Sequence, residues 1–136
     1  MSIAKFIAGQ EAGDAELMAM FHDIIISKDE NVSATIGTMM GKEMIIYNQH
    51  NTFKYGLAKA KNYFSLHVLP MYCNPEVYEK YKKLLPKAKF QKGCINFNNQ
   101  DEMPPAIVSK LISDCSKIDI HALLNKMKES KKAKAK

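Results

Sequence analysis

The sequence predicts an α+β fold in which N- and C-terminal helices pack on one face of an antiparallel sheet of about five strands. Three observations lead to this prediction. Apolar residues recur every three or four positions near the N-terminus and again beyond residue 104, as in amphipathic helices. Between residues 32 and 68 the apolar period changes to two, which is typical of half-buried strands. The connections between these strands are short, which favours an antiparallel meander.

The first helix is expected over residues 13–27, because its apolar side chains fall on one face. These side chains are Leu17, Met18, Phe21, Ile24 and Ile25. Asp14 is predicted to cap the start of this helix, and the polar run from Asp29 to Asn31 ends the pattern. Four strands are then expected over residues 33–40, 43–48, 52–58 and 62–68.

The second half of the chain returns to helices with one further strand. The sequence predicts a helix over residues 75–85, a strand over 93–97, a helix from 105 and a last helix from 120. Pro75 suits the first turn of a helix, and Pro86 prevents that helix from continuing. Asp119 is expected to cap the last helix.

Strand alternation assigns side chains to the two sheet faces. The face expected to pack under the helices carries Met44, Ile46, Phe53, Tyr55, Leu57, Phe64, Leu66 and Val68. The other face is expected to carry Glu43, Ile45, Tyr47, Lys54, Gly56, Tyr63, Ser65 and His67. From these faces we expect Phe21, Phe64 and Leu66 to be buried in the core.

The second face mixes aromatic, basic and acidic groups, so it is either an ordinary solvated face or a shallow binding site. As a site, its candidate ligand-binding residues are Tyr47, Lys54, Tyr63, His67 and Lys92. Lys92 belongs to a group with Lys61, Lys87 and Lys89 that flanks the predicted sheet edge. Such lysines bind a small anion or, more commonly, protect an edge strand against aggregation.

Charge and length limit the classes of partner. The 136 residues predict one domain over residues 1–128, followed by a basic disordered tail over 129–136. The net charge is +6, but six lysines and one glutamate lie from residue 126 onward, and the remainder is nearly neutral. All 20 basic residues are lysine, so the arginine fork that reads guanine is absent and specific nucleic-acid recognition is disfavoured.

Cysteine usage and apolar runs indicate a cytoplasmic protein. Three widely spaced cysteines, Cys73, Cys94 and Cys115, favour a reducing compartment over a disulfide scaffold. The run from Ile24 to Ile26 is too short to cross a membrane, and no signal peptide is expected at the N-terminus. We expect a monomer or weak homodimer with no cofactor.

Catalytic and metal-binding patterns are sparse. Ser65 and His67 share a strand face, but residues two apart on a strand lie about 7 Å from each other, too far for a hydrogen bond. No Gly-x-Ser-x-Gly elbow occurs. Cys94 is expected to be a small core residue.

An iron site would need clustered oxygen ligands. The candidates on and before the first helix are Glu11, Asp14, Glu16 and Asp23.

Residues 56–68 read Gly-Leu-Ala-Lys-Ala-Lys-Asn-Tyr-Phe-Ser-Leu-His-Val. This segment resembles the strand-turn-strand of the YdhG-like family of small bacterial domains of unknown function. Residues 85–97, Leu-Pro-Lys-Ala-Lys-Phe-Gln-Lys-Gly-Cys-Ile-Asn-Phe, are similar to its lysine- and glycine-rich turn before a Cys-containing strand. The prolines of residues 103–105 are a weaker match. The resemblance implies helices packed on one face of an antiparallel sheet, and one relative has been likened to frataxin.

Two functions from different classes therefore follow from the sequence. The first is a non-enzymatic binding domain that holds a small molecule or a protein partner on the polar-aromatic sheet face. The alternative is a frataxin-like iron-binding protein or iron chaperone. An anion-dependent enzyme is a third possibility, although the sequence shows no paired acid and base for it.

Overall fold

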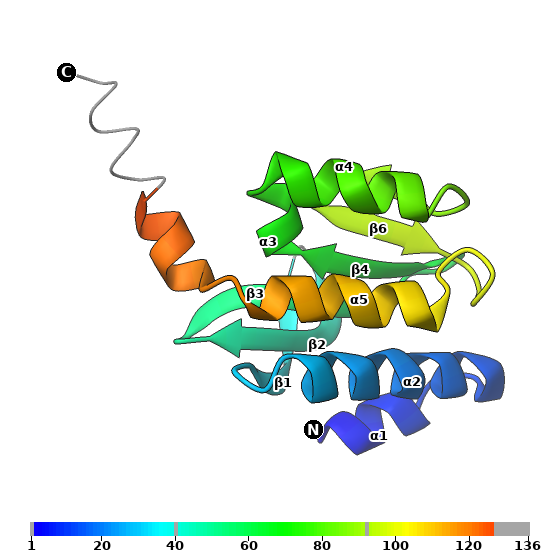
Figure 1. The fold of residues 1–136 in the computed structure, drawn as a ribbon. Helices are drawn as coiled ribbons and strands as arrows, with labels where there is room; N and C mark the ends of the chain where they lie inside the picture. The colour runs from blue at the N-terminus through cyan, green and yellow to red at the C-terminus, as the bar shows by residue number, and fades with distance from the viewer. Residues whose placement is uncertain (1, 40, 92, 127–136) are drawn as a thin grey trace.

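The computed structural model describes residues 2–39, 41–91 and 93–126. Its helices and strands follow one another in the order shown in Figure 1. They are α1 (Ile3–Ala8), α2 (Ala12–Lys28), β1 (Ser33–Met39), β2 (Lys42–Gln49), β3 (Thr52–Lys59), β4 (Phe64–Val68), α3 (Leu69–Tyr72), α4 (Pro75–Leu84), β5 (Lys89–Gln91), β6 (Cys94–Phe97) and α5 (Pro105–Ser116). A further helical segment covers residues 120–126.

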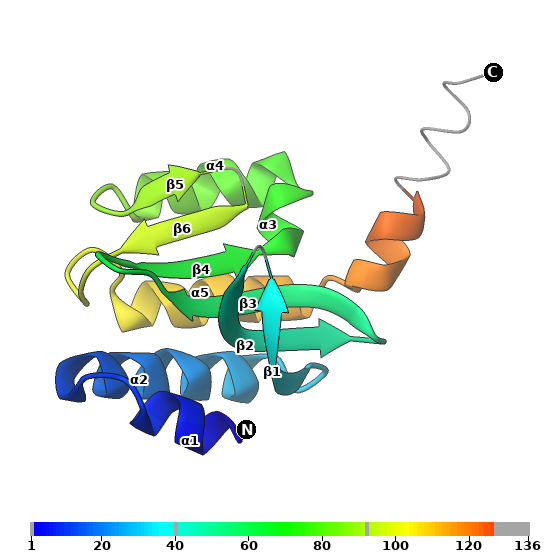
Figure 2. The ribbon, with the colours of Figure 1, turned by 180° about the vertical axis from the view of Figure 1, so that it is seen from behind.

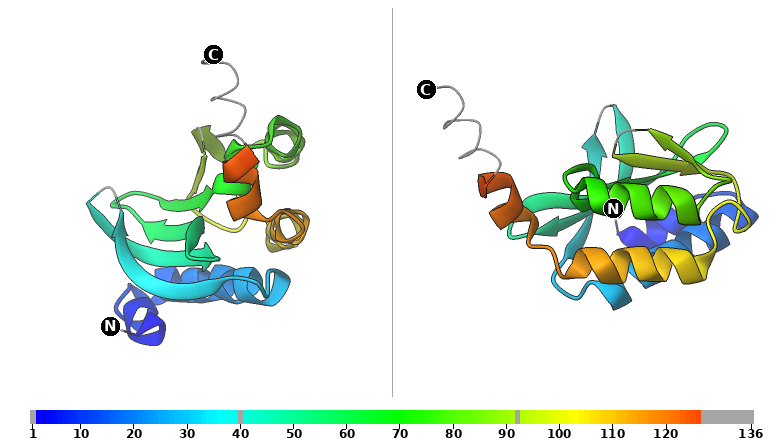
Figure 3. Two further views of the ribbon diagram at one scale, coloured as in Figure 1. Left: turned by 90° about the vertical axis from the view of Figure 1, so that its left-hand side faces the viewer. Right: turned by 45° about the horizontal axis from the view of Figure 1, so that its top comes forward.

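The six strands form one antiparallel sheet in the order β1-β2-β3-β4-β6-β5. The helices α2, α3, α4 and α5 lie on one face of this sheet (Figure 1). Seen from behind, the opposite face is uncovered (Figure 2), and we call it the open face. The β1–β2 hairpin curves away from the helices, so the open face is concave (Figure 3). The predicted α+β architecture is confirmed, with one more strand than expected.

The elements that the sequence did not predict are short. They are the six-residue α1, the four-residue α3 and the three-residue β5. Elements of one turn or three residues carry too few positions to show a hydrophobic period. The predicted helix over 13–27 corresponds to α2, which begins one residue earlier, after Glu11.

Two expected caps have different outcomes. Asp14 lies in the first turn of α2 rather than at its cap, and Glu11 occupies the cap position without a side-chain hydrogen bond. Asp119 does cap the last helical segment, because its Oδ1 accepts a hydrogen bond from the Ala122 N–H at 3.0 Å. The predicted basic tail over 129–136 lies outside the described residues.

The β2–β3 hairpin contains an irregularity in its pairing. As a result, the side chains of β2 point to the opposite sheet face from the one that the sequence predicted. Tyr47 pairs with Tyr55 and Asn48 pairs with Phe53, so Lys54 and Tyr55 together oppose one residue of β2. This is the arrangement of a β-bulge, which shifts the register by one residue. A shift of one residue moves every following side chain to the other face. Ile45 and Tyr47 therefore face the helices, whereas the sequence placed them on the open face. Conversely, Met44 and Phe53 were expected under the helices but line hollows of the open face.

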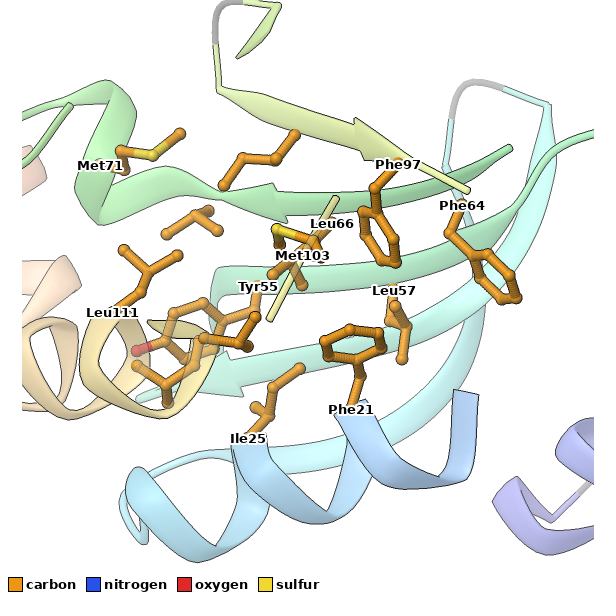
Figure 4. Packing of buried hydrophobic residues seen from close by; sticks show 14 of the residues in the cluster. Phe21, Ile25, Tyr55, Leu57, Phe64, Leu66, Met71, Phe97, Met103 and Leu111 are labelled. Carbon is orange, nitrogen blue, oxygen red and sulfur yellow. The ribbon is translucent and has the colours of Figure 1, made fainter. Parts of the chain in front are cut away.

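The core lies between the sheet and helices α2, α4 and α5. Figure 4 shows part of it, with Phe21 and Ile25 from α2 and Leu111 from α5. Phe21, Phe64 and Leu66 are each at most 1% exposed, as expected. The Phe97 ring packs edge-on against Phe21 at a centroid distance of 5.0 Å and stacks on Phe64 at 5.6 Å. These aromatic contacts join α2 to β4 and β6 and fix which sheet face the helices cover.

No helix among the described residues combines the length and the apolar character needed to cross a membrane.

Candidate functional site

Small residues on the central strand β3 create a hollow in the open face. Gly56 and Ala58 alternate with large core residues on β3, and Ala60 follows in the turn to β4. Ala58 and Ala60 line the hollow, and each carries only a methyl group. Gly56 does not line it, because the Phe53 ring and Met44 lie over this glycine: a Cβ built there would come 3.2 Å from the ring. A cavity of about 450 Å³ results, which we call the open-face hollow. Ligand-binding pockets commonly have volumes of about 300–1,000 Å³.

Residues from opposite ends of the sheet line this hollow, because the sheet is curved. Its lining residues are Met39, Lys42, Met44, Ala58, Ala60, Tyr63, Ser65, His67, Gln91, Cys94 and Asn96. Ser65 and Asn96 pair across β4 and β6, and His67 pairs with Cys94 one step further along. Four polar side chains therefore form a compact patch on the wall opposite β1 and β2.

A thiol–imidazole pair lies at the centre of this patch. The Cys94 Sγ is 2.8 Å from the His67 Nδ1, and both side chains are half-buried. The backbone N–H of Val68 donates to the Gly93 carbonyl at 2.8 Å and extends the β4–β6 ladder past the pair. The two residues are directly opposite in the sheet register, so the backbone holds the two side chains together.

Burial keeps both members of this pair neutral. It lowers the pKa of His67, and the nearby Lys42 ammonium lowers it further. Burial also raises the pKa of the Cys94 thiol, and an interaction with the Ser65 hydroxyl partly opposes this rise. A neutral imidazole beside a neutral thiol can accept the thiol proton through Nδ1.

Lys42 and Tyr63 form the rim of the hollow. The Lys42 Nζ lies 5.8 Å from the centre of the Tyr63 ring, within the range of a cation–π interaction. Tyr63 remains 37% exposed, so its ring is open to a ligand. Lys42 is the one charged side chain among the described residues of the lining, and it favours an anionic ligand.

Two smaller hollows continue the first in opposite directions. One, of about 410 Å³, shares Tyr63, Gln91 and Asn96 with it. This polar end is lined in addition by Asn62, Lys87, Lys89, Asn98 and Glu102. The other, of about 350 Å³, shares His67 and Cys94. This apolar end is lined in addition by Phe53, Val68, Leu69, Tyr72 and Gly93. We call these three neighbouring hollows together the groove; the Cys94–His67 pair lines both its main hollow and its apolar end.

The structure brings together only part of the predicted ligand-binding set. Tyr63 and His67 line the open-face hollow. Tyr47 and Lys54 do not, because both side chains are 0% exposed on the helix-covered side. Their placement on the open face was wrong, and the bulge at Lys54 is the reason. Lys92 lies outside the described residues.

Lys54 belongs instead to a buried polar network. Its ammonium lies 2.7 Å from Asp29 Oδ2 and makes no hydrogen bond of good geometry within the described residues. The Tyr55 hydroxyl donates to the same oxygen at 2.8 Å. Burial raises the pKa of Tyr55, and Cys115 and Asp29 nearby raise it further. All three groups are 0% exposed, and none of them lines any of the three hollows described above.

Tyr47 has a single polar contact, with a helix. Its hydroxyl lies 2.7 Å from the His22 Nδ1 on α2. Burial lowers the pKa of His22, and Asp23 partly opposes this change. The contact satisfies a tyrosine hydroxyl inside the core and places both residues away from the open face.

The four carboxylates considered for iron lie along α2. Asp14 Oδ2 lies 3.8 Å from the Lys59 ammonium. Glu11, Glu16 and Asp23 are exposed. Among the described residues, no three His, Cys, Asp or Glu side chains lie close enough together to hold a metal ion.

Cys94 is one of the site residues that the sequence did not predict, together with Lys42 and Asn96. Its neighbour His67 is 27 positions away, and only the β4–β6 register joins them. Ala58 and Ala60 are the sequence signal for the hollow itself, because two small residues two positions apart at the end of a strand fall on one face of the sheet. No family model, curated protein or solved structure matches the chain.

Proposed function

We propose that this chain is a binding domain that holds a small molecule in the open-face hollow. The observation that carries the proposal is the shape of the open face, a cavity of about 450 Å³ in which polar groups converge above an apolar floor. Met44, Ala58 and Ala60 supply apolar surface, whereas Gln91 and Asn96 supply amide groups. A ligand with an apolar body and one anionic or carbonyl end fits this distribution.

The charge at the rim favours the anionic end. Lys42 borders the hollow, and Lys87 and Lys89 border its polar extension. Lysine acts as a point charge for carboxylate or phosphate. The exposed Tyr63 ring offers a flat surface for an aromatic or aliphatic body. The ligand class we propose is a small organic anion.

The cellular setting belongs to the same proposal. All three cysteines lie within the described residues and are free thiols, which supports a reducing cytoplasm. We take the domain to act as a monomer or weak homodimer, without specific binding to nucleic acid. The proposal does not extend to iron, because the exposed carboxylates of α2 form no cluster and Asp14 is paired with Lys59.

Calorimetry on a set of small carboxylates with aromatic or aliphatic bodies tests this function. A carboxylate that binds the wild type should bind Lys42→Ala and Tyr63→Ala at least about tenfold more weakly, a difference of about 1.4 kcal/mol. Lys28→Ala is the matched control, because Lys28 is exposed at the end of α2. Equal losses in Lys28→Ala and Lys42→Ala would show attraction by net charge alone. The absence of any hit would contradict the small-ligand proposal and leave the open face as a surface for a protein partner.

A further inference from the structure

We propose that Cys94 is a nucleophile, with His67 as its general base, and that it accepts the acyl group of a small thioester. This inference rests on the proposed function, because the thioester must first bind in the open-face hollow. It adds to that function a reacting atom, a base and a class of substrate.

The first argument is the geometry of the thiol. Cys94 Sγ and His67 Nδ1 are 2.8 Å apart, within the distance over which a nucleophile passes its proton to a base. Both residues line the main hollow and its apolar extension, so the thiol is at a surface that a ligand can reach. Cys115 offers a contrast, because it is 0% exposed in the core. Of these two thiols, only Cys94 combines a base with an adjoining cavity.

The second argument is the position of the pair within the groove. On one side lie the apolar walls formed by Phe53, Val68 and Tyr72. On the other side the groove leads past Asn96 toward Lys87 and Lys89. A molecule lying along the groove would place its apolar part beyond Cys94 and its anionic part among the lysines. A thioester of an apolar acid whose thiol portion is negatively charged has this distribution, with its reactive carbonyl between the two parts.

The step balances without an oxidant or a reductant. His67 Nδ1 takes the proton of the Cys94 thiol as the sulfur forms a bond to the thioester carbonyl carbon. The bond from that carbon to the leaving sulfur then breaks, and the proton passes from His67 to the leaving thiolate. The products are S-acyl-Cys94 and a free thiol, and no atom changes its oxidation state.

The pH dependence follows from the groups that face the pair. These groups are Lys42 from β2, Tyr63 from the turn before β4, and Ser65 from β4. Burial and Lys42 both lower the pKa of His67 from 6.5, so His67 is mostly neutral at pH 7. With an active base, acylation is therefore expected to be nearly constant between pH 7 and 8. Without that base it depends on free thiolate and rises about tenfold per pH unit.

Intact-mass spectrometry of the full chain with butyryl-coenzyme A tests the proposal. We expect one butyryl adduct in the wild type and in Cys73→Ala, and none in Cys94→Ala. Cys73 is the matched control, because it is half-buried like Cys94 but makes no hydrogen bond to a histidine within the described residues. In His67→Gln the rate at pH 7 should fall by roughly 10²-fold, the usual contribution of a general base. The variant should also acquire the steep pH dependence.

Acylation of Cys73 as fast as Cys94 would overturn the proposal. An unchanged rate and pH profile in His67→Gln would also overturn it, and a thermal melt separates that result from misfolding. Binding is measured separately, by calorimetry of Cys94→Ala with the unreactive thioether S-butyl-coenzyme A. Binding of the thioether without acylation of the wild type would refute the nucleophile and leave the binding function intact. If neither acylation nor binding of the thioether is detected, thioesters are refuted as a ligand class. The proposed binding function is then decided separately, by the calorimetry with carboxylates.

Discussion

The two faces of the sheet use the same strands for opposite purposes. On the helix-covered face, β3 contributes Tyr55 and Leu57, which are 0% exposed and surrounded by core residues. On the open face the neighbouring position is Ala58, which lines the hollow. Large side chains on one face supply stability, and small ones on the other leave room for a ligand. The difference shows that stability and a binding site can be separated residue by residue along one strand.

The largest expected effect is on the free energy of unfolding, and it distinguishes two adjacent residues: Phe64 on the helix-covered face and Tyr63 on the open face. Phe64→Ala should lower the free energy of unfolding by about 3–5 kcal/mol, because it removes a core ring stacked on Phe97. Tyr63→Ala should lower it by less than about 1 kcal/mol, because Tyr63 is 37% exposed. Chemical denaturation measures both. Similar losses would show that the open face is as important for stability as the core.

A second prediction concerns the buried network of Lys54, Asp29 and Tyr55. Lys54 belongs to this network, although the sequence placed it on the open face. Asp29→Ala should cost at least about 3 kcal/mol in chemical denaturation, because it leaves the Lys54 ammonium buried without an anion. The triple variant Asp29→Leu, Lys54→Met, Tyr55→Phe removes every member of the network and should recover most of that loss. A cost below about 1 kcal/mol for the single variant would place Lys54 near water, on the side that the sequence predicted.

A third prediction fills the hollow. Ala58→Leu should change the free energy of unfolding by less than about 1 kcal/mol, because the added atoms enter open space rather than a packed core. The same variant should lose affinity for any carboxylate that binds the wild type. Leu57→Ala, one residue away, should instead cost about 2–5 kcal/mol and retain binding at a temperature where it is folded. Binding that survives Ala58→Leu would place the ligand elsewhere.

The smallest expected effect is the dependence of stability on pH. Burial lowers the folded-state pKa of His67 below 6.5, so the unfolded chain binds more protons as pH falls through that value. Stability should therefore decrease as pH falls below about 6.5. His67→Gln should make the decrease shallower, and His22→Gln should do the same, since burial also lowers the pKa of His22. A decrease in both variants as steep as in the wild type would show that neither histidine is buried.

The sequence predicted the buried sides of α2 and β4 correctly, because their apolar periodicity is regular. Phe21, Phe64 and Leu66 were expected in the core and are buried there. The prediction failed around the β2–β3 bulge. Tyr47 and Lys54 were expected on the open face but are buried, whereas Met44 and Phe53 were expected under the helices but line the open face. The extra residue in β3 moves the side chains of β2 to the opposite face, and period-two reasoning cannot detect a bulge. The three-residue β5 was missed because it is too short to show a pattern.

Of the candidate site, the sequence predicted Tyr63 and His67 but not the groups that surround them. Cys94 and Asn96 reach the site through the β4–β6 pairing, which skips 25 residues of chain and two helices. Lys42 arrives because the β1–β2 hairpin curves over the open face (Figure 3). Neither long-range pairing nor sheet curvature leaves a local sequence signal, so these contacts required the structure.

An amide-resolved NMR titration of the wild type with the carboxylate set tests the central claim most directly, because it locates binding without any substitution. The account predicts that shifts concentrate on the hollow, at Lys42, Ala58, Tyr63, His67 and Asn96. Residues of the helix-covered face, such as Leu111 on α5, should remain unshifted. Shifts concentrated on the helices, or saturable binding that leaves these strands unchanged, would contradict the assignment of the ligand site to the open face.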